Sequence, residues 1–281
     1  MSVAAATVHR YETLKATPIT GGIGAEISGV DLRDLSDGLI VDPKRVWLDY
    51  KVLFFREQKL TQAEHVAYGR ALGELEVHPF TPNDSQYPEI IILHSRPENF
   101  FAAQTWHSDV TFRACPPLGS ILYGRIIPTW GGDTCFANME LAYDLLSDEI
   151  KEDINGLNAV HSLEKTFAQR MDDEQREGAF EAYPDQVHPI VRSHPETGNK
   201  SIFVNVNFTL YVQDRSEEES SGLLNKLYDQ AAKPEVQCRF RWHAGSVAQW
   251  DNRCTQHYAV PDYVGEERRV ERVTLVGDRP R

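Results

Sequence analysis

Residues 106–112 read Trp-His-Ser-Asp-Val-Thr-Phe, and the interpretation of the whole chain follows from this stretch. His107 and Asp109 are two positions apart, and on a β-strand such residues point to the same face of the sheet. We therefore predict that an imidazole and a carboxylate enter one cavity, as two legs of a 2-His-1-carboxylate triad. Such a triad holds Fe(II) on one side and leaves the opposite coordination positions open. The pattern alone also fits a His–Asp pair that is hydrogen-bonded in a turn.

The stretch 250–259, Trp-Asp-Asn-Arg-Cys-Thr-Gln-His-Tyr-Ala, supplies a candidate for the third ligand. Its His257 follows an expected strand at 246–250 and would complete the triad if the first and last strands of a barrel meet. A lone histidine is more often hydrogen-bonded within a core. Beside an H-x-D pair and suitable arginines, His257 is better explained as a ligand.

Two arginines near the C-terminus, Arg268 and Arg272, are four positions apart at an expected strand over 270–276. Positions of equal parity share one face of a strand, so both guanidinium groups would enter the same cavity. Arginine forms bidentate, charge-assisted hydrogen bonds to carboxylate or sulfonate, and two arginines would serve two anions. The alternative is a solvated basic cluster paired with the neighbouring glutamates, which we prefer for Arg269.

The rest of the chain predicts many short strands and few helices, which favours a barrel or a sandwich. Glycine pairs and alternating apolar residues predict a hairpin-like opening at 18–32. N-cap signals predict helices that begin after Thr61, Asn138 and Ser216. Apolar segments of strand length recur at 51–56, 89–93, 120–125, 157–162, 201–205, 236–242, 246–250 and 270–276.

The chain contains no internal repeat and no Gly/Ser-rich or Pro-rich linker. We therefore expect one domain over residues 15–281, preceded by a loose arm at 1–14. The polar, acidic stretch 169–187 has no periodicity. We interpret it as an excursion from the barrel, either a solvated loop or a lid.

The 281 residues include 29 basic and 42 acidic side chains, which give a formal net charge of −13. This balance argues against nucleic acid and anionic membrane surfaces as partners, since both bind basic proteins. No segment reaches the roughly 20 apolar residues of a transmembrane helix, and no secretory signal is recognisable. Four scattered cysteines without a C-x-x-C motif are typical of the reducing cytoplasm.

Six blocks follow one another along the chain: WHSDVTF, PPLGSIL, GGDT, HPIVRSHPETG, WDNRCTQHYA and RRVERVTLVGD. In this order, and over nearly the whole chain from Gly22 to Gly277, they resemble the TauD/TfdA family of Fe(II)- and 2-oxoglutarate-dependent dioxygenases. The resemblance implies a mainly β fold of the α+β class, with helices packed around a double-stranded β-helix (jelly-roll) core. It also implies Fe(II), 2-oxoglutarate and O2 as cofactor and co-substrates, and a homodimer or homotetramer.

The resemblance assigns roles to five residues around the metal. His107, Asp109 and His257 match the iron ligands of the family motif. Arg268 matches the arginine that clamps the distal carboxylate of 2-oxoglutarate, and Thr134 in the GGDT block matches the threonine that assists it.

A further set of residues matches the family's site for the prime substrate, a small organic anion. Arg272 and His78 match side chains that face a substrate sulfonate or sulfate. Phe167, Phe208 and Trp250 fall where the family has apolar pocket walls, although core packing explains these aromatic residues as well. His188 and His194 are interpreted as structural histidines in proline-flanked turns.

Two positions depart from the pattern of taurine-specific members. Ala103 stands where those members have an amide side chain, and Thr81 stands where they have a tyrosine. Both changes remove polar contacts to a small zwitterion, so an alkylsulfonate, an alkyl sulfate or an aryloxyalkanoate is a comparable candidate to taurine.

The implied reaction hydroxylates the substrate carbon and releases succinate and CO2. The adduct of a sulfonate then collapses to sulfite and an aldehyde. The rival interpretations are a metal-dependent hydrolase that uses the same triad and a catalytically silent binding barrel.

Overall fold

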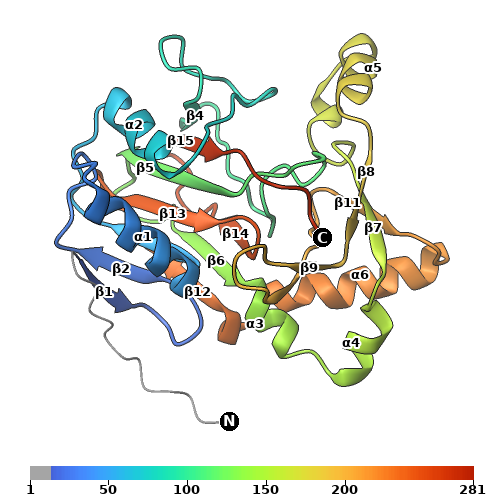
Figure 1. The fold of residues 1–281 in the computed structure, drawn as a ribbon. Helices are drawn as coiled ribbons and strands as arrows, with labels where there is room; N and C mark the ends of the chain where they lie inside the picture. The colour runs from blue at the N-terminus through green and yellow to red at the C-terminus, as the bar shows by residue number, and fades with distance from the viewer. Residues whose placement is uncertain (1–13) are drawn as a thin grey trace.

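The computed structural model describes residues 14–281, so the arm expected at 1–14 lies almost wholly outside the described residues (Figure 1). The largest sheet has seven strands in the order β1-β2-β3-β13-β5-β15-β4. These strands are β1 (Lys15–Pro18), β2 (Ala25–Ser28), β3 (Val52–Phe55), β13 (Val247–Asp251), β5 (Gly119–Ile126), β15 (Arg268–Leu275) and β4 (Ile91–Ser95). A three-stranded sheet, β12-β6-β14, faces it and is formed by β12 (Gln237–Phe240), β6 (Thr134–Asn138) and β14 (Thr255–Ala259).

The space between these two sheets is the interior of the double-stranded β-helix. The large sheet contributes alternate apolar side chains, and the small sheet contributes aromatic rings that meet them. The cluster includes Val52, Phe54, Leu122, Ala248, Trp250 and Val270 from the large sheet, and Phe136, Cys238 and Phe240 from the small sheet. The expected jelly-roll core is therefore confirmed, and burial of these apolar side chains is its main stabilising contribution.

Helices cover the outer face of the large sheet, where α1 (Asp37–Tyr50) and α2 (Gln62–Leu72) lie (Figure 1). Trp47 and Val66 from these helices pack against Leu53 and Val273 of the sheet. The capping box of Thr61 begins α2 as predicted. Helix α1 was not predicted, because its N-cap makes no side-chain hydrogen bond and its sequence contains a proline at position 43, which is unusual within a helix.

The remaining elements form a third layer beside the barrel (Figure 1). A three-stranded sheet has the order β11-β7-β8, and β10 pairs with β9. The strands are β7 (Asn158–His161), β8 (Gln186–Pro189), β9 (Val191–Ser193), β10 (Lys200–Ile202) and β11 (Thr209–Val212). The helices are α3 (Met139–Asp144), α4 (Asp148–Ile154) and α6 (Glu217–Ala231), with one-turn 3-10 helices at Ala168–Arg170 and Pro234–Val236. The predicted starts of α3 and α6 are confirmed by the caps of Asn138 and Ser216.

The stretch 169–187 contains a helix, α5 (Asp173–Ala182), which stands out from the body of the molecule (Figure 1). Asp172 and Gln175 form a capping box that begins it. Ala179 and Phe180 pack into a cluster of aromatic rings beside the barrel. Helix α5 has only one short apolar face, which explains why its sequence shows no obvious helical periodicity. A lid role for residues 169–187 stays a prediction.

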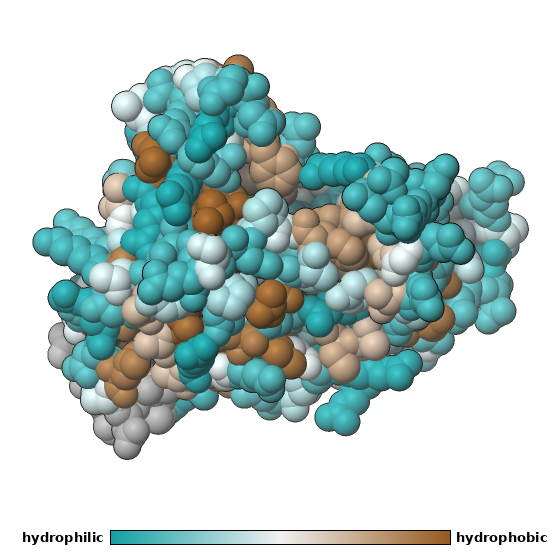
Figure 2. All heavy atoms as spheres, turned by 90° about the horizontal axis from the view of Figure 1, so that it is seen from above, coloured by the Kyte–Doolittle hydropathy of each residue, from teal (hydrophilic) through white to brown (hydrophobic). Residues whose placement is uncertain are grey.

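The surface seen in Figure 2 is mainly hydrophilic, with apolar side chains gathered in small separate patches. No helix among residues 14–281 is long and apolar enough to cross a membrane.

Gly277, directly after β15, marks a point where two backbone segments touch. A Cβ atom at this position would lie 1.9 Å from the Pro116 carbonyl oxygen and 2.5 Å from the Leu118 amide nitrogen. We expect Gly277→Ala to lower the free energy of unfolding by about 3 kcal/mol, because neither backbone segment can move away cheaply. Gly222→Ala is the matched control, since its Cβ meets nothing within 4 Å and it lies in helix α6. Denaturant unfolding should show this control as stabilised by up to about 1 kcal/mol, and equal effects of the two changes would contradict the packing argument.

Candidate active site

The H-x-D motif does not lie on a regular strand, so that expectation was wrong. His107 forms an isolated bridge with His257 of β14, with backbone N–H to carbonyl distances of 3.1 and 2.8 Å. The chain then turns at Asp109, and Val110 adopts a positive φ of 37°. The turn nevertheless brings the three side chains together, because one ligand atom of each of His107, Asp109 and His257 lies within 4.8 Å of the others.

Hydrogen bonds and burial prepare the two imidazoles to bind a metal. Nδ1 of His107 donates to the Thr105 carbonyl oxygen at 2.7 Å, which leaves Nε2 as the ligand atom. Nε2 of His257 lies 3.8 Å from Oδ1 of Asp109, while its Nδ1 is buried and has no hydrogen-bond partner among residues 14–281. Burial lowers the pKa of both histidines. Neutral imidazoles are the form that ligates a metal.

Asp109 is held from two sides. Its Oδ2 accepts hydrogen bonds from Oγ of Ser120 at 2.9 Å and from Nδ2 of Asn252 at 3.2 Å. Nη1 of Arg272 donates to Oδ1 at 2.5 Å. Burial alone would raise the pKa of Asp109, but the charge of Arg272 and the adjacent histidines hold it well below its usual range.

Ser120 and Asn252 were not singled out from the sequence, although both lie inside the PPLGSIL and WDNRCTQHYA blocks. Asn252 is itself oriented by Trp250, whose indole Nε1 donates to Oδ1 of Asn252 at 2.9 Å. Both residues could have been identified from the sequence, because each is a polar residue inside one of these blocks. Together they fix the Asp109 carboxylate and leave Oδ1 directed at the triad.

Arg268 is a buried cation without a carboxylate partner among residues 14–281. It is 7% exposed, and the rings of Trp242 and Tyr263 lie 5.7 and 5.8 Å from its guanidinium carbon. Its Nε has no hydrogen-bond partner, and burial lowers its pKa. A buried charge is stable only when it is compensated, so the arginine requires an anion, and no carboxylate of the described residues forms an ion pair with it.

Thr134 and Gly132 shape the space beside Arg268. Oγ1 of Thr134 accepts a hydrogen bond from Nε1 of Trp242 at 2.9 Å, so the hydroxyl hydrogen remains available for a second oxygen. A Cβ atom at Gly132 would lie 3.3 Å from Cδ of Arg268. Two imidazoles, one carboxylate and an unpaired arginine therefore fit Fe(II) together with a dicarboxylate.

His78 and Arg272 are both buried, and the charge of Arg272 acts on the His78 imidazole. The segment before His78 is anchored to the end of β15, where Leu75 bridges Leu275 and the Glu76 amide donates to the Thr274 carbonyl at 3.0 Å. This arrangement supports the expectation that both side chains serve one anion.

The backbone fixes the tautomer of His78. Its Nδ1 accepts the amide hydrogens of Phe80 and Thr81 at 3.2 and 3.0 Å, so the ring hydrogen is on Nε2. Burial, reinforced by the charge of Arg272, lowers the pKa of His78 to about 3. His78 is therefore a neutral hydrogen-bond donor at physiological pH, and Arg272 carries the positive charge.

Phe167 and Phe208 belong to an aromatic cluster beside His78. The ring of Phe167 lies 5.7 Å from His78 and 6.3 Å from Phe208, measured between centroids. Phe112 also contacts both phenylalanine rings. Trp250 lies elsewhere: it is 1% exposed in the barrel interior, with its ring 4.8 Å from that of His257.

Thr81 and Ala103 depart from the pattern of taurine-specific members, and both make backbone hydrogen bonds next to histidines of the site. The amide of Thr81 holds Nδ1 of His78. The carbonyl of Ala103 accepts the Ala259 amide at 3.0 Å, at the end of the strand that carries His257. The methyl group of Ala103 offers no hydrogen bond to a substrate amine.

His188, His194 and Arg269 have the structural contacts that were expected of them. Nε2 of His188 donates to the Arg113 carbonyl at 3.0 Å, and His194 donates to Oδ2 of Asp251 at 3.1 Å. Arg269 pairs with Glu271 at 2.8 Å.

His194, Asp251 and Cys254 also converge with metal-ligand spacing. However, the Arg253 guanidinium binds both oxygens of Asp251. A cation is therefore already present there, and the group is a buried ion-pair network.

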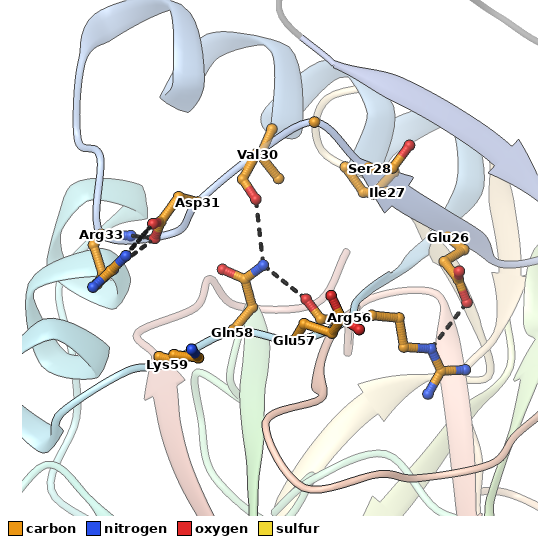
Figure 3. Close-up of a pocket in the computed structure, with 11 residues that line it drawn as sticks. Glu26, Ile27, Ser28, Val30, Asp31, Arg33, Arg56, Glu57, Gln58 and Lys59 are labelled. Atoms are coloured by element: carbon orange, nitrogen blue, oxygen red, sulfur yellow. Dashed lines mark hydrogen bonds and ion pairs between the residues drawn. The ribbon is translucent and has the colours of Figure 1, made fainter.

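A surface groove of about 430 Å³, lined by none of these residues, lies between the β2–α1 loop and residues 56–59 (Figure 3). Its charges compensate one another. Arg33 pairs with Asp31 at 2.5 Å, and Arg56 pairs with Glu26 at 3.0 Å. The groove is therefore a hydrophilic surface hollow.

Comparisons with known proteins agree with this geometry. The family model described as taurine catabolism dioxygenase TauD, TfdA family, matches residues 15–274. An alkylsulfatase of Acinetobacter baylyi is 38% identical over 276 residues, which cover 95% of this chain and 86% of the relative. An alpha-ketoglutarate-dependent sulfate ester dioxygenase of Pseudomonas putida is 36% identical over 290 residues, covering 99% and 95%.

A solved structure extends the agreement to three dimensions. The crystal structure of a taurine dioxygenase from Burkholderia xenovorans superposes with a TM-score of 0.83 at 36% identity, and the match covers 95% of this chain and 91% of the other. The chain belongs to the TauD/TfdA family of Fe(II)- and 2-oxoglutarate-dependent dioxygenases.

Proposed function

We propose that the chain holds Fe(II) with His107, Asp109 and His257 and oxidises a small organic anion at the expense of 2-oxoglutarate and O2. The observation that carries this proposal is the triad, with ligand atoms within 4.8 Å, beside a buried arginine that lacks an anion. When bound, the iron supplies the activation of O2 that is coupled to the decarboxylation of 2-oxoglutarate to succinate and CO2.

Arg268 and Thr134 are the residues that would hold the distal carboxylate of 2-oxoglutarate. Arg268 offers charge-assisted hydrogen bonds, and Thr134 offers the hydroxyl hydrogen that its bond from Trp242 leaves free. Fixing both ends of a flexible keto acid removes rotational freedom before the reaction. The rings of Trp242 and Tyr263 exclude water from the arginine.

Arg272 and His78 would hold the head group of the substrate. Arg272 supplies the charge, and the neutral Nε2–H of His78 supplies a directed hydrogen bond. Phe167 and Phe208 would contact the apolar part of the substrate and exclude water.

With Ala103 and Thr81 in place of polar side chains, this site favours an anion with an apolar tail over a zwitterion. An alkylsulfonate, an alkyl sulfate and an aryloxyalkanoate all meet that description. In the reaction, one oxygen atom of O2 enters succinate and the other converts a substrate C–H to C–OH. A hydroxylated sulfonate then expels sulfite and becomes an aldehyde.

We further propose that the enzyme works in the cytoplasm as a homodimer or homotetramer. All four cysteines are free thiols, which supports a reducing compartment. Sedimentation of the full chain would test the oligomeric state.

We expect the reaction to require both Fe(II) and 2-oxoglutarate. Anaerobic addition of Fe(II) and 2-oxoglutarate is expected to give a weak visible metal-to-ligand absorption band, and admitting O2 with a suitable anion should release succinate. A screen of alkylsulfonates, alkyl sulfates and aryloxyalkanoates for succinate identifies the substrate class. Chelation of the metal should abolish both signals. Absence of the band together with no succinate from any anion would overturn the proposal.

We expect substitutions at Arg268 and Arg272 to weaken the binding of different anions, 2-oxoglutarate and the prime substrate respectively. Arg268→Ala is expected to raise KM for 2-oxoglutarate by at least about tenfold, because charge-assisted hydrogen bonds are lost. Arg272→Ala is expected to raise KM for the prime substrate by a similar factor. Succinate-release kinetics with each reactant varied in turn measure both. If both changes affected only the keto acid, the division of roles between Arg268 and Arg272 would be wrong.

A further inference from the structure

Glu76 is a buried carboxylate beside the head-group site, and none of the roles assigned above uses it. It is 8% exposed and lies opposite Thr274, to which its amide donates. Because side chains alternate along an extended chain, Glu76 points to the same side as His78, whereas the intervening Val77 is exposed.

Only one oxygen of Glu76 is paired. Oε2 accepts a hydrogen bond from Nη1 of Arg113, whereas Oε1 is buried without a partner among residues 14–281. Burial raises the pKa of this carboxyl to about 6, and the charges of Arg113 and Arg272 oppose the rise. Glu76 is therefore ionised above neutral pH, in electrostatic contact with both arginines.

The side chains around the proposed head-group site determine the net charge that a substrate meets there. Glu76 neutralises Arg113, and His78 is neutral. Asp109 is committed to the iron position. Among residues 14–281, Arg272 therefore supplies the one positive charge of this group that remains for a substrate.

We propose that Glu76 is a specificity-determining residue that restricts the substrate head group to a monoanion by neutralising Arg113. Sulfonates, sulfate esters and carboxylates satisfy this rule, whereas phosphate monoesters of the same shape do not. A dianion would bring its second charge close to the ionised Glu76, and none of the charged side chains named here from the described part of the chain would neutralise it. The inference rests on the proposed function of Arg272 and His78 and adds the charge of the substrate.

A Glu–Arg pair that served only the fold would change stability without changing charge selectivity. The deciding quantity is therefore the ratio of two dissociation constants, for a monoanion and a dianion of equal shape. Hexyl sulfate and hexyl phosphate are such a pair, since a phosphate monoester is dianionic well above its second pKa of about 6.

The experiment measures binding of both esters by calorimetry to the full chain loaded with Fe(II) and 2-oxoglutarate, without O2, at about pH 8, where the phosphate is dianionic. The wild-type protein is expected to prefer hexyl sulfate. In Glu76→Gln the free charge of Arg113 should shift the phosphate-to-sulfate ratio toward phosphate by about tenfold. Binding of 2-oxoglutarate should not change.

Glu140→Gln is the matched control. Glu140 is also buried, pairs through Oε2 with Lys51 at 3.2 Å, and has an unpartnered Oε1, but it lies on α3 and takes no part in the site. This variant should leave the ratio at the wild-type value. The double variant Glu76→Gln/Arg113→Gln removes both charges and should restore the wild-type ratio.

Three results would overturn the proposal. One is a wild-type protein that binds both esters equally, and another is a ratio that stays the same in Glu76→Gln. The third is a double variant that keeps the altered ratio. If neither ester binds while the loaded protein still shows its absorption band, the head-group assignment of Arg272 and His78 fails and this proposal with it, but the iron and keto-acid assignment stands.

Discussion

The carboxylate of Asp109 is the point on which the rest of the site depends, because a buried charge is stable only when its surroundings compensate it on every side. Ser120 of β5 and Asn252 of the β13–β14 turn hold one oxygen. Arg272 of β15 and His257 of β14 face the other. Elements from distant parts of the chain therefore converge on a single side chain. The barrel that brings these strands together is also what assembles the metal ligands.

Arg268 is a buried charge without such compensation among the described residues. This difference from Asp109 explains why Arg268 is suited to binding an anion. Arg272 has a carboxylate partner, whereas Arg268 makes no ion pair among the described residues and has the rings of Trp242 and Tyr263 near its guanidinium group. An uncompensated buried cation costs stability. Ligands that bind only the folded state raise its stability by mass action, so a dicarboxylate held by Arg268, as proposed, would stabilise this region as well as take part in the reaction.

Local sequence signals predicted a large part of the structure. The capping boxes of Thr61 and Ser216 begin helices as expected, and the equal parity of Arg268 and Arg272 places both in the interior. The spacing of the H-x-D motif misled in one respect, because a turn can also align residues at i and i+2. Glu76 and similar polar residues were missed since their partners are far away in sequence, and only the folded barrel brings them together.

The position of Arg272 also links the metal to the substrate site. Its Nη1 binds Oδ1 of Asp109, the same oxygen that lies 3.8 Å from Nε2 of His257. A metal ion held by His107, Asp109 and His257 would draw on the charge of the same Asp109 oxygen. Asp109 would then hold the Arg272 guanidinium less tightly, and more of its charge would be available to the proposed substrate anion. One shared oxygen atom would therefore couple the proposed metal and substrate sites.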